Sequence, residues 1–132
     1  MDKEIKALIE KHFGDGYNGH NNIKLKELKL NYAKVEAKLT ANSFNGNKIA
    51  HGGLIYSLAD DAMGTAALST GRNVCTVNAQ IDYLRPGIGK KLIAEAESVK
   101  VGKTLGVYKC KIYNDEDKLV ATATGTYYFL DA

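Results

Sequence analysis

The amino-acid sequence predicts an α+β fold in which one antiparallel sheet of about six strands packs against one long helix. Three observations support this fold class. Apolar residues recur at helical spacing from His51 to Ser69, they alternate with polar residues from Ile23 to Thr40, and four further strand-like runs follow Gly71. A short helix is expected before the first strand.

The N-terminal part of the chain changes from helical to strand-like periodicity. Apolar residues at every third or fourth position predict a short amphipathic helix from Asp2 to Phe13, which Gly14 and Gly16 end. From Ile23 to Thr40 the apolar residues alternate with charged ones in two successive runs. Two half-buried strands are therefore expected there.

The long helix is predicted from the segment with the strongest apolar content. Residues Ala41 to Ala50 are polar and contain turn-forming asparagine and glycine, which predicts a loop. His51 to Ser69 then contains neither proline nor a β-branched run, so it is expected to form the longest and most buried helix. Its apolar surface is wider than one sheet covers, and we expect a second copy of the chain to cover part of it.

The remainder of the chain predicts four strands separated by turn signals. Consecutive strands joined by tight turns pair mainly antiparallel. The four expected strands are Val74 to Leu84, Lys91 to Val101, Leu105 to Tyr113 and Leu119 to Leu130.

Composition narrows the class of protein. A chain of 132 residues, 45% of them hydrophobic and 25% charged, fits one domain over residues 1–132. No apolar run reaches the roughly 20 residues that span a bilayer, and the charged N-terminus is not a signal peptide, so a cytoplasmic protein without membrane partners is expected. The net charge of +3 is dispersed, which disfavours nucleic acid as a partner. Cys75 and Cys110 lie in apolar runs and are expected to be reduced, buried thiols, with no metal site.

The triplet His51-Gly52-Gly53 stands at the start of the long helix. Glycines there leave backbone amides at the positive end of the helix dipole open to an oxygen that carries negative charge. Such amides form an oxyanion hole. Two glycines also suit a tight entry turn, and the triplet alone does not decide between these interpretations.

An acidic residue lies on a helix face of small side chains. Steps of four, three and four residues place Gly53, Ser57, Asp60 and Gly64 on one face, so the Asp60 carboxylate is expected beside a groove. There it would act as a general base on water or attack a carbonyl carbon directly. The alternative, a solvated charge or the partner of a lysine, suits the neighbouring Asp61 better.

Gly52 and Asp60 are too far apart to act together within one chain. A rise of about 1.5 Å per residue separates them by about 12 Å along the helix. Two antiparallel copies of the helix, related by a two-fold axis, would bring Gly52 of one subunit near Asp60 of the other. The sequence therefore predicts that a dimer forms the site.

Three segments occur in a characteristic order: NGNKIAHGGLIYSLADDAMGTA, TVNAQIDYLRPG and VGKTLGVYKCKIYNDEDKLVATATGTY. Together they resemble the hotdog-fold thioesterases of the phenylacetate-degradation (PaaI-like) type, over roughly Ile23 to Phe129. The resemblance implies a sheet wrapped around the long helix and hydrolysis of an acyl-coenzyme A thioester to a carboxylic acid and coenzyme A. It also implies an obligate homodimer, with a homotetramer as the expected larger assembly, and no cofactor.

The resemblance carries over to individual residues. In that family an asparagine six residues before the histidine, the first glycine, and an acidic residue nine after the histidine form the active site; here they are Asn45, Gly52 and Asp60. Asp60 would be base or nucleophile, the Gly52 amide would form the oxyanion hole, and Asn45 would orient the thioester or the water. Thr76 occupies the place of an assisting hydroxyl, with an ordinary strand threonine as the alternative.

The resemblance also indicates where the substrate binds. His51 is expected to shape the helix entrance beside Gly53 and not to be a general base. The pantetheine arm would follow the groove, and Leu54, Tyr56 and Met63 would line the acyl pocket or, in the preferred interpretation, belong to the core. Cations expected to contact phosphate, or else to be solvated, are Arg72, Arg85, Lys90 and Lys103.

Two other functions compete with hydrolysis. A hotdog dehydratase would need a catalytic histidine with an acidic partner, and the pair His12 and Asp15 lies before the first strand, where it is badly placed for that chemistry. A non-catalytic acyl-coenzyme A sensor would use the same groove for binding alone. The carboxylate of Asp60 in an apolar helix argues against a sensor, because a pure binder gains by losing an isolated buried charge.

Overall fold

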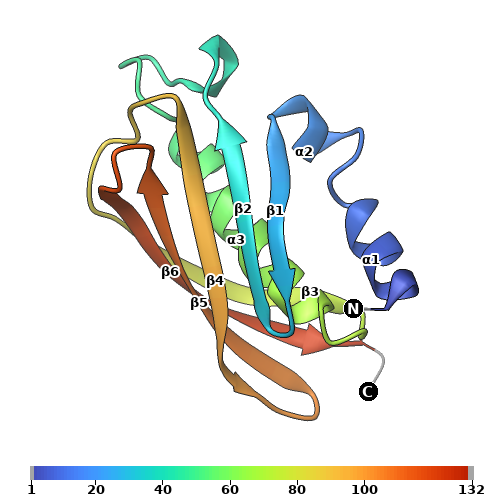
Figure 1. Ribbon diagram of the computed structural model, residues 1–132. Helices are drawn as coiled ribbons and strands as arrows, with labels where there is room; N and C mark the ends of the chain where they lie inside the picture. The colour runs from blue at the N-terminus through green and yellow to red at the C-terminus, as the bar shows by residue number, and fades with distance from the viewer. Residues whose placement is uncertain (1, 131–132) are drawn as a thin grey trace.

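A computed structural model describes residues 2–130, in which a six-stranded antiparallel sheet wraps around helix α3 (Figure 1). This is the predicted α+β hotdog fold. The elements in chain order are α1 (Lys3–Glu10), α2 (Tyr17–His20), β1 (Ile23–Lys29), β2 (Tyr32–Lys38), the short 3-10 helix η1 (Ala41–Ser43), α3 (Gly52–Leu68), β3 (Val74–Tyr83), β4 (Lys91–Val101), β5 (Leu105–Asn114) and β6 (Leu119–Phe129).

The sheet has the strand order β1-β2-β4-β5-β6-β3. The expected antiparallel pairing is confirmed. However, β3 pairs with β6 and not with β4, so the prediction of a tight turn between β3 and β4 was wrong. The connection between them instead crosses one end of the sheet and passes the start of α3, where the Ala50 amide donates to the Gly87 carbonyl at 2.9 Å. This crossover leaves β3 at one edge of the sheet and β1 at the other.

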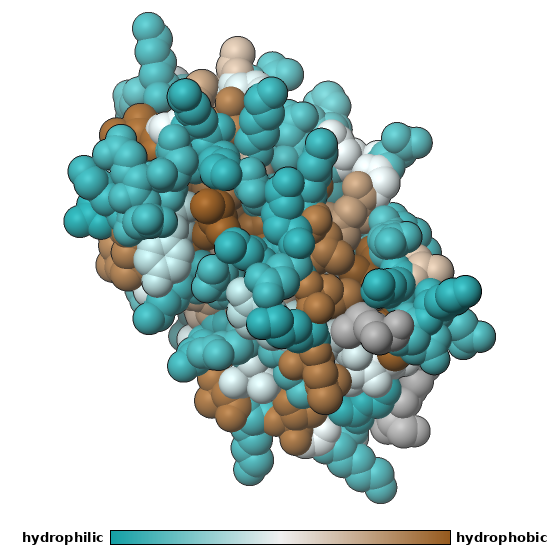
Figure 2. Space-filling model, in the orientation of Figure 1, coloured by the Kyte–Doolittle hydropathy of each residue, from teal (hydrophilic) through white to brown (hydrophobic). Residues whose placement is uncertain are grey.

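Two bulges explain the irregular alternation in the sequence. In β1 the register shifts between Leu25 and Glu27, which returns Leu28 to the helix-facing side after an odd step. In β4 a shift between Ser98 and Lys100 turns the end of the strand, and Val99 is 60% exposed. Hydrophobic side chains at this lower end of the molecule are visible in Figure 2.

Helix α3 supplies the centre of the core. Leu58, Ala62 and Met63 have no exposed surface, and the helix packs mainly on β2, β4 and β5. Leu54 is also buried, so the core interpretation holds for Leu54 and Met63. It is wrong for Tyr56, which is 38% exposed and donates a hydrogen bond to the Ala79 carbonyl.

The N-terminal segment is more structured than the sequence indicated. The expected helix is shorter, ending at Glu10, and a second helix, α2, follows it without having been predicted. Both helices lie beside β1 in Figure 1. The Tyr17 hydroxyl of α2 lies 2.8 Å from the Ser57 hydroxyl of α3, so this segment reaches the face of α3 that carries the small residues.

The position of β3 at an edge accounts for one further correction. Both cysteines are free, but Cys75 on β3 is exposed and only Cys110 on β5 is buried. Burial raises the pKa of the Cys110 thiol to about 12, which leaves it protonated and unreactive.

Within residues 2–130 there is no helix with the length and apolarity needed to cross a membrane.

The packing of α3 predicts a large cost for truncating its buried side. Leu58→Ala is expected to lower the free energy of unfolding by about 2–5 kcal/mol, because the site is closed on all sides and a cavity would remain. Chemical denaturation at fixed protein concentration measures this difference. The matched control is Leu30→Ala, at a leucine 69% exposed, which should change stability by less than about 0.5 kcal/mol; equal losses would contradict the packing described.

Candidate active site

The first turn of α3 offers one unpaired backbone amide. His51 caps the helix: its Nδ1 accepts from the Gly53 amide at 2.8 Å, and its carbonyl accepts from the Leu54 amide at 2.9 Å. The Gly53 amide therefore already donates a hydrogen bond within the chain. The Gly52 amide donates to no atom of residues 2–130, and an amide at this end of a helix suits a negatively charged oxygen.

A hollow of about 380 Å³ lies at the start of α3 and is lined by Asn45, Gly52, Tyr83 and Arg85 among others. The Asn45 side-chain oxygen accepts from the Asn47 amide at 2.8 Å, which fixes the side chain in the loop. The Tyr83 hydroxyl donates to the Gly52 carbonyl at 2.8 Å. We call this the Gly52 hollow.

Asp60 lies eight residues further along α3 with two hydroxyl partners. Its Oδ1 accepts from the Tyr127 hydroxyl at 2.7 Å and from the Thr76 hydroxyl at 3.1 Å. These donors come from β6 and β3. A second hollow of about 240 Å³, the Asp60 hollow, is lined by Asp60, Thr76, Gly64 and Tyr127 among others.

Tyr127 is a site residue that the sequence did not single out. It is 1% exposed, and its hydroxyl bonds to Asp60. Burial, and next the charge on Asp60, raise the pKa of the Tyr127 hydroxyl, so it stays a hydrogen-bond donor. The available signal was its position in the alternating last strand, because a buried tyrosine needs a partner for its hydroxyl.

The neighbouring Asp61 has a different environment. Its Oδ2 is buried without a hydrogen-bond partner within residues 2–130. Burial raises the pKa of its carboxyl to about 7; the Asn18 side chain lowers this pKa through a hydrogen bond, and the charge on Asp60 raises it. The two adjacent carboxyl groups thus differ in their surroundings: Asp60 is bonded to two hydroxyl donors, and burial favours the neutral form of Asp61.

The predicted residues fall into two groups within one chain. Asn45, Gly52 and Arg85 line the Gly52 hollow, whereas Asp60 and Thr76 line the Asp60 hollow. Gly52 and Asp60 thus line different hollows of the described chain, as their separation along α3 requires.

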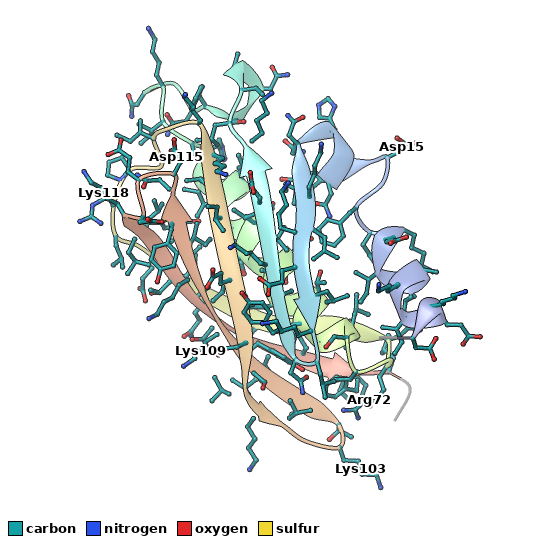
Figure 3. The ribbon with its side chains drawn as sticks, viewed as in Figure 1. Asp15, Arg72, Lys103, Lys109, Asp115 and Lys118 are labelled. Carbon is teal, nitrogen blue, oxygen red and sulfur yellow. The ribbon has the colours of Figure 1, made fainter. Side chains whose placement is uncertain are left out.

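Two of the four phosphate candidates are engaged in structural contacts. Arg85 donates to the Leu119 carbonyl at 2.9 Å. Arg72 donates to the Lys103 carbonyl at 2.9 Å and stacks on the Phe129 ring, with 3.5 Å from the guanidinium carbon to the ring centroid. Lys103 lies at the tip of the β4–β5 hairpin, as Figure 3 shows.

The histidine and aspartate considered for a dehydratase are separated. His12 lines the Asp60 hollow, which is closer to the site than its place in the sequence indicated. Asp15 is exposed and lies on the outer side of the N-terminal segment (Figure 3). Asp15 does not line the hollow that contains His12, so the pair of His12 and Asp15 considered for a dehydratase is not assembled there.

Comparison with known proteins places this architecture in a family. The Thioesterase superfamily matches residues 47–121. The acyl-coenzyme A thioesterase PaaI of Escherichia coli is 40% identical over 95 residues, which cover 71% of this chain and 68% of PaaI. The solved structure of E. coli PaaI, from the phenylacetic acid degradation operon, superposes with a TM-score of 0.89 and 30% identity, covering 96% of this chain and 93% of PaaI.

Structures of two streptococcal proteins are also similar. A hypothetical thioesterase protein from Streptococcus pneumoniae, solved once with an aspartate and once with a threonine sixteen positions later changed to alanine, has a TM-score of 0.78 and 28% identity, with 83% of this chain covered. These matches cover 91% and 90% of that protein. A Streptococcus mutans protein solved with bound acetyl-coenzyme A has a TM-score of 0.77 and 29% identity, covering 82% of this chain and 88% of that protein.

The fold, the unpaired amide at the start of α3 and the matched family define a thioester hydrolase with the hotdog fold. The chain belongs to the thioesterase superfamily and, within it, to the PaaI-like hotdog thioesterases.

The buried Asp61 carboxyl predicts a pH dependence of stability. Its folded pKa of about 7 lies above the ordinary 3.8, so the protonated form stabilises the fold at low pH and this contribution is lost as pH rises toward about 7. Asp61→Asn mimics the protonated form. Its free energy of unfolding should exceed that of the wild type by an amount that grows from about pH 4 to pH 7 and reaches about 1–3 kcal/mol.

Urea denaturation across a pH series measures this difference. The exposed Asp15→Asn is the control and should show no such growth with pH, because its carboxyl lies in solvent. A difference between Asp61→Asn and the wild type that stays constant from pH 4 to pH 8 would refute the assignment.

Proposed function

We propose that the chain hydrolyses acyl-coenzyme A thioesters at a site shared by two subunits, with Asp60 of one and the Gly52 amide and Asn45 of the other. The observation that carries the proposal is the division into half-sites. Asp60 and its hydroxyl partners line one hollow, and Gly52, whose amide is unpaired within residues 2–130, lines another. Neither half alone holds both a base and an oxyanion donor.

The two edges of the sheet indicate where the subunits pair. Edge β1 carries Lys24, Lys26 and Lys29 and a bulge, features that prevent edge-to-edge association. Edge β3 contains neither lysine nor arginine, and most of its residues are exposed. An unprotected edge of this kind is expected to pair with an identical strand across a two-fold axis.

The contacts between β3 and α3 set the register of that pairing. Thr76 of β3 bonds to Asp60, and Tyr83 at the other end of β3 bonds to Gly52. If β3 pairs antiparallel with its copy so that Thr76 lies opposite the partner's Tyr83, then Asp60 of one subunit approaches the partner's Gly52. One strand pairing thus assembles two identical sites.

The chemistry follows from the joined halves. The Asp60 carboxylate removes a proton from water while the water oxygen attacks the thioester carbon, and the carbonyl oxygen becomes an oxyanion bound by the Gly52 amide. The carbon–sulfur bond then breaks, the carboxylic acid forms, and the coenzyme A sulfur receives the proton. Alternatively Asp60 attacks the carbon directly, and the carbon–sulfur bond breaks to give an anhydride and the coenzyme A thiolate. Water then hydrolyses the anhydride, which releases the carboxylic acid, restores the Asp60 carboxylate and supplies the proton that the thiolate takes up.

The relatives support this assignment. E. coli PaaI is an acyl-coenzyme A thioesterase, and the S. mutans relative binds acetyl-coenzyme A. Asp60 and Thr76 are sixteen positions apart, the same spacing as the aspartate and threonine changed in the S. pneumoniae protein. The shared spacing fits a pair in which the hydroxyl orients the carboxylate.

Removal of the carboxylate is the first test. Asp60→Asn should lower kcat at least about 100-fold on aromatic and aliphatic acyl-coenzyme A thioesters, because both routes need the charged oxygen. The assembly should remain intact by size-exclusion chromatography. Binding without turnover by the wild type would favour a sensor, and addition of water to enoyl thioesters would favour a dehydratase.

The oxyanion donor has its own test, because proline lacks the amide hydrogen. Proline is tolerated at the first position of a helix, and His51, with φ −59 and ψ 134, already has the conformation that precedes proline. Gly52→Pro should therefore fold and lose about 100- to 1000-fold in kcat. Gly52→Ala keeps the amide and is the control, since its added carbon would lie 3.5 Å from the Tyr83 hydroxyl, an ordinary contact.

Mixing the two inactive variants tests whether the site is shared. A dimer of one Asp60→Asn and one Gly52→Pro subunit has both changes in one site and leaves the other site intact. After unfolding and joint refolding, about a quarter of wild-type activity should return, because half of randomly formed dimers are mixed and each has one intact site. Sites contained within single subunits would give no recovery.

A further inference from the structure

A third hollow, which shares no lining residue with the Asp60 hollow, is lined by positive side chains. It has a volume of about 450 Å³ and lies where the start of β1 and the end of β2 meet the start of β4. In Figure 2 the upper part of this face is mostly hydrophilic. The hollow is lined by Asn22, Lys24, Lys26, Glu36, Lys38, Lys90 and Lys91.

The charges in this lysine hollow are not balanced within the described chain. Glu36 is the only carboxylate in its lining, and it pairs with Lys91 at 3.5 Å. The other four lysines make no ion pair within residues 2–130. Ammonium groups that converge without counter-charges repel one another, and an anion with several charges would relieve that repulsion.

The lysine hollow is close to the Gly52 hollow. Gly87 lines the Gly52 hollow and accepts from the Ala50 amide just before α3. Lys90 lines the lysine hollow, and its carbonyl accepts from the Leu39 amide at the end of β2. Three residues separate Gly87 from Lys90, so this backbone spans at most about 10 Å.

We propose that the lysine hollow binds the phosphates of the 3′-phospho-ADP end of coenzyme A when the thioester lies at the Gly52 amide. This inference rests on the proposed function and adds a binding site to it. Lysines bind phosphate as point charges, and the volume is in the range of small-molecule sites. The pantetheine arm then runs from the Gly52 hollow across the β3–β4 connection.

The lysines of this hollow are, except for Lys90, different from the cations that the sequence indicated as phosphate ligands. Arg72 and Arg85 donate to backbone carbonyls, and Lys103 lies at the opposite end of the sheet from Asp115 (Figure 3). Asp115 accepts from the Lys90 amide and so marks the end at which the lysine hollow lies. Of the four candidates, only Lys90 lines it.

A substrate series tests the assignment. The double variant Lys24→Gln/Lys38→Gln should raise KM for an acyl-coenzyme A about three- to tenfold at low salt and leave kcat unchanged, because two exposed phosphate contacts are lost. KM for the same acyl group on pantetheine, which has no nucleotide, should not change. The matched control is Lys29→Gln/Lys34→Gln, which removes two lysines from the same strands outside the hollow and should alter neither KM.

Direct binding separates this inference from the proposed function. Calorimetric titration with adenosine 3′,5′-bisphosphate requires no turnover, and the Lys24→Gln/Lys38→Gln variant should bind it at least about threefold more weakly than the wild type. If the wild type hydrolyses no acyl-coenzyme A, the proposed function fails and this titration still decides the site. Equal binding by both proteins, an equal rise in KM for the pantetheine thioester, or equally tight binding of inorganic pyrophosphate would overturn the inference.

Discussion

Helix α3 holds its first amide and the Asp60 carboxylate at a fixed separation, because eight residues of regular helix cannot shorten. The buried side of the helix, centred on Leu58 and Met63, fixes it against the sheet and leaves Gly53, Ser57, Asp60 and Gly64 on the less buried side. A base and an oxyanion donor on one rigid rod cannot meet at one carbonyl. The proposed pairing of subunits answers this constraint.

The adjacent residues Asp60 and Asp61 show how the surroundings of one helix position suit it to the role of the proposed base. Asp60 and Asp61 are adjacent, but successive helical residues point about 100° apart, so they meet different surroundings. Asp60 receives hydroxyl donors from two strands, whereas an oxygen of Asp61 is buried without a partner within residues 2–130. Burial raises the pKa of the Asp61 carboxyl to about 7, so near that pH about half of the Asp61 side chains carry no charge beside the proposed base.

The sequence predicted what depends on local periodicity and failed where distant segments meet. The long helix, the two early strands and the shared face of Gly53, Ser57, Asp60 and Gly64 follow from spacing alone. The position of β3 does not, because a strand's neighbour in a sheet is decided by how the chain crosses over. Consequently the prediction that Cys75 is buried was wrong. The contact of Tyr127 with Asp60 joins residues 67 positions apart, and local periodicity does not indicate which residues meet over such a distance.

The same reasoning explains why the lysine hollow was not visible in the sequence. Its cations come from β1, β2 and the β3–β4 connection, and each alone resembles an ordinary solvated lysine. The lysines of β1 protect that edge from pairing, and Lys24 and Lys26 of this edge also line the hollow. In the proposed assembly, lysines of the β1 edge that prevent strand pairing also contribute to phosphate binding, while the β3 edge, which contains neither lysine nor arginine, pairs with a second subunit. The distribution of lysine between the two edges of one sheet thus gives each edge its proposed role.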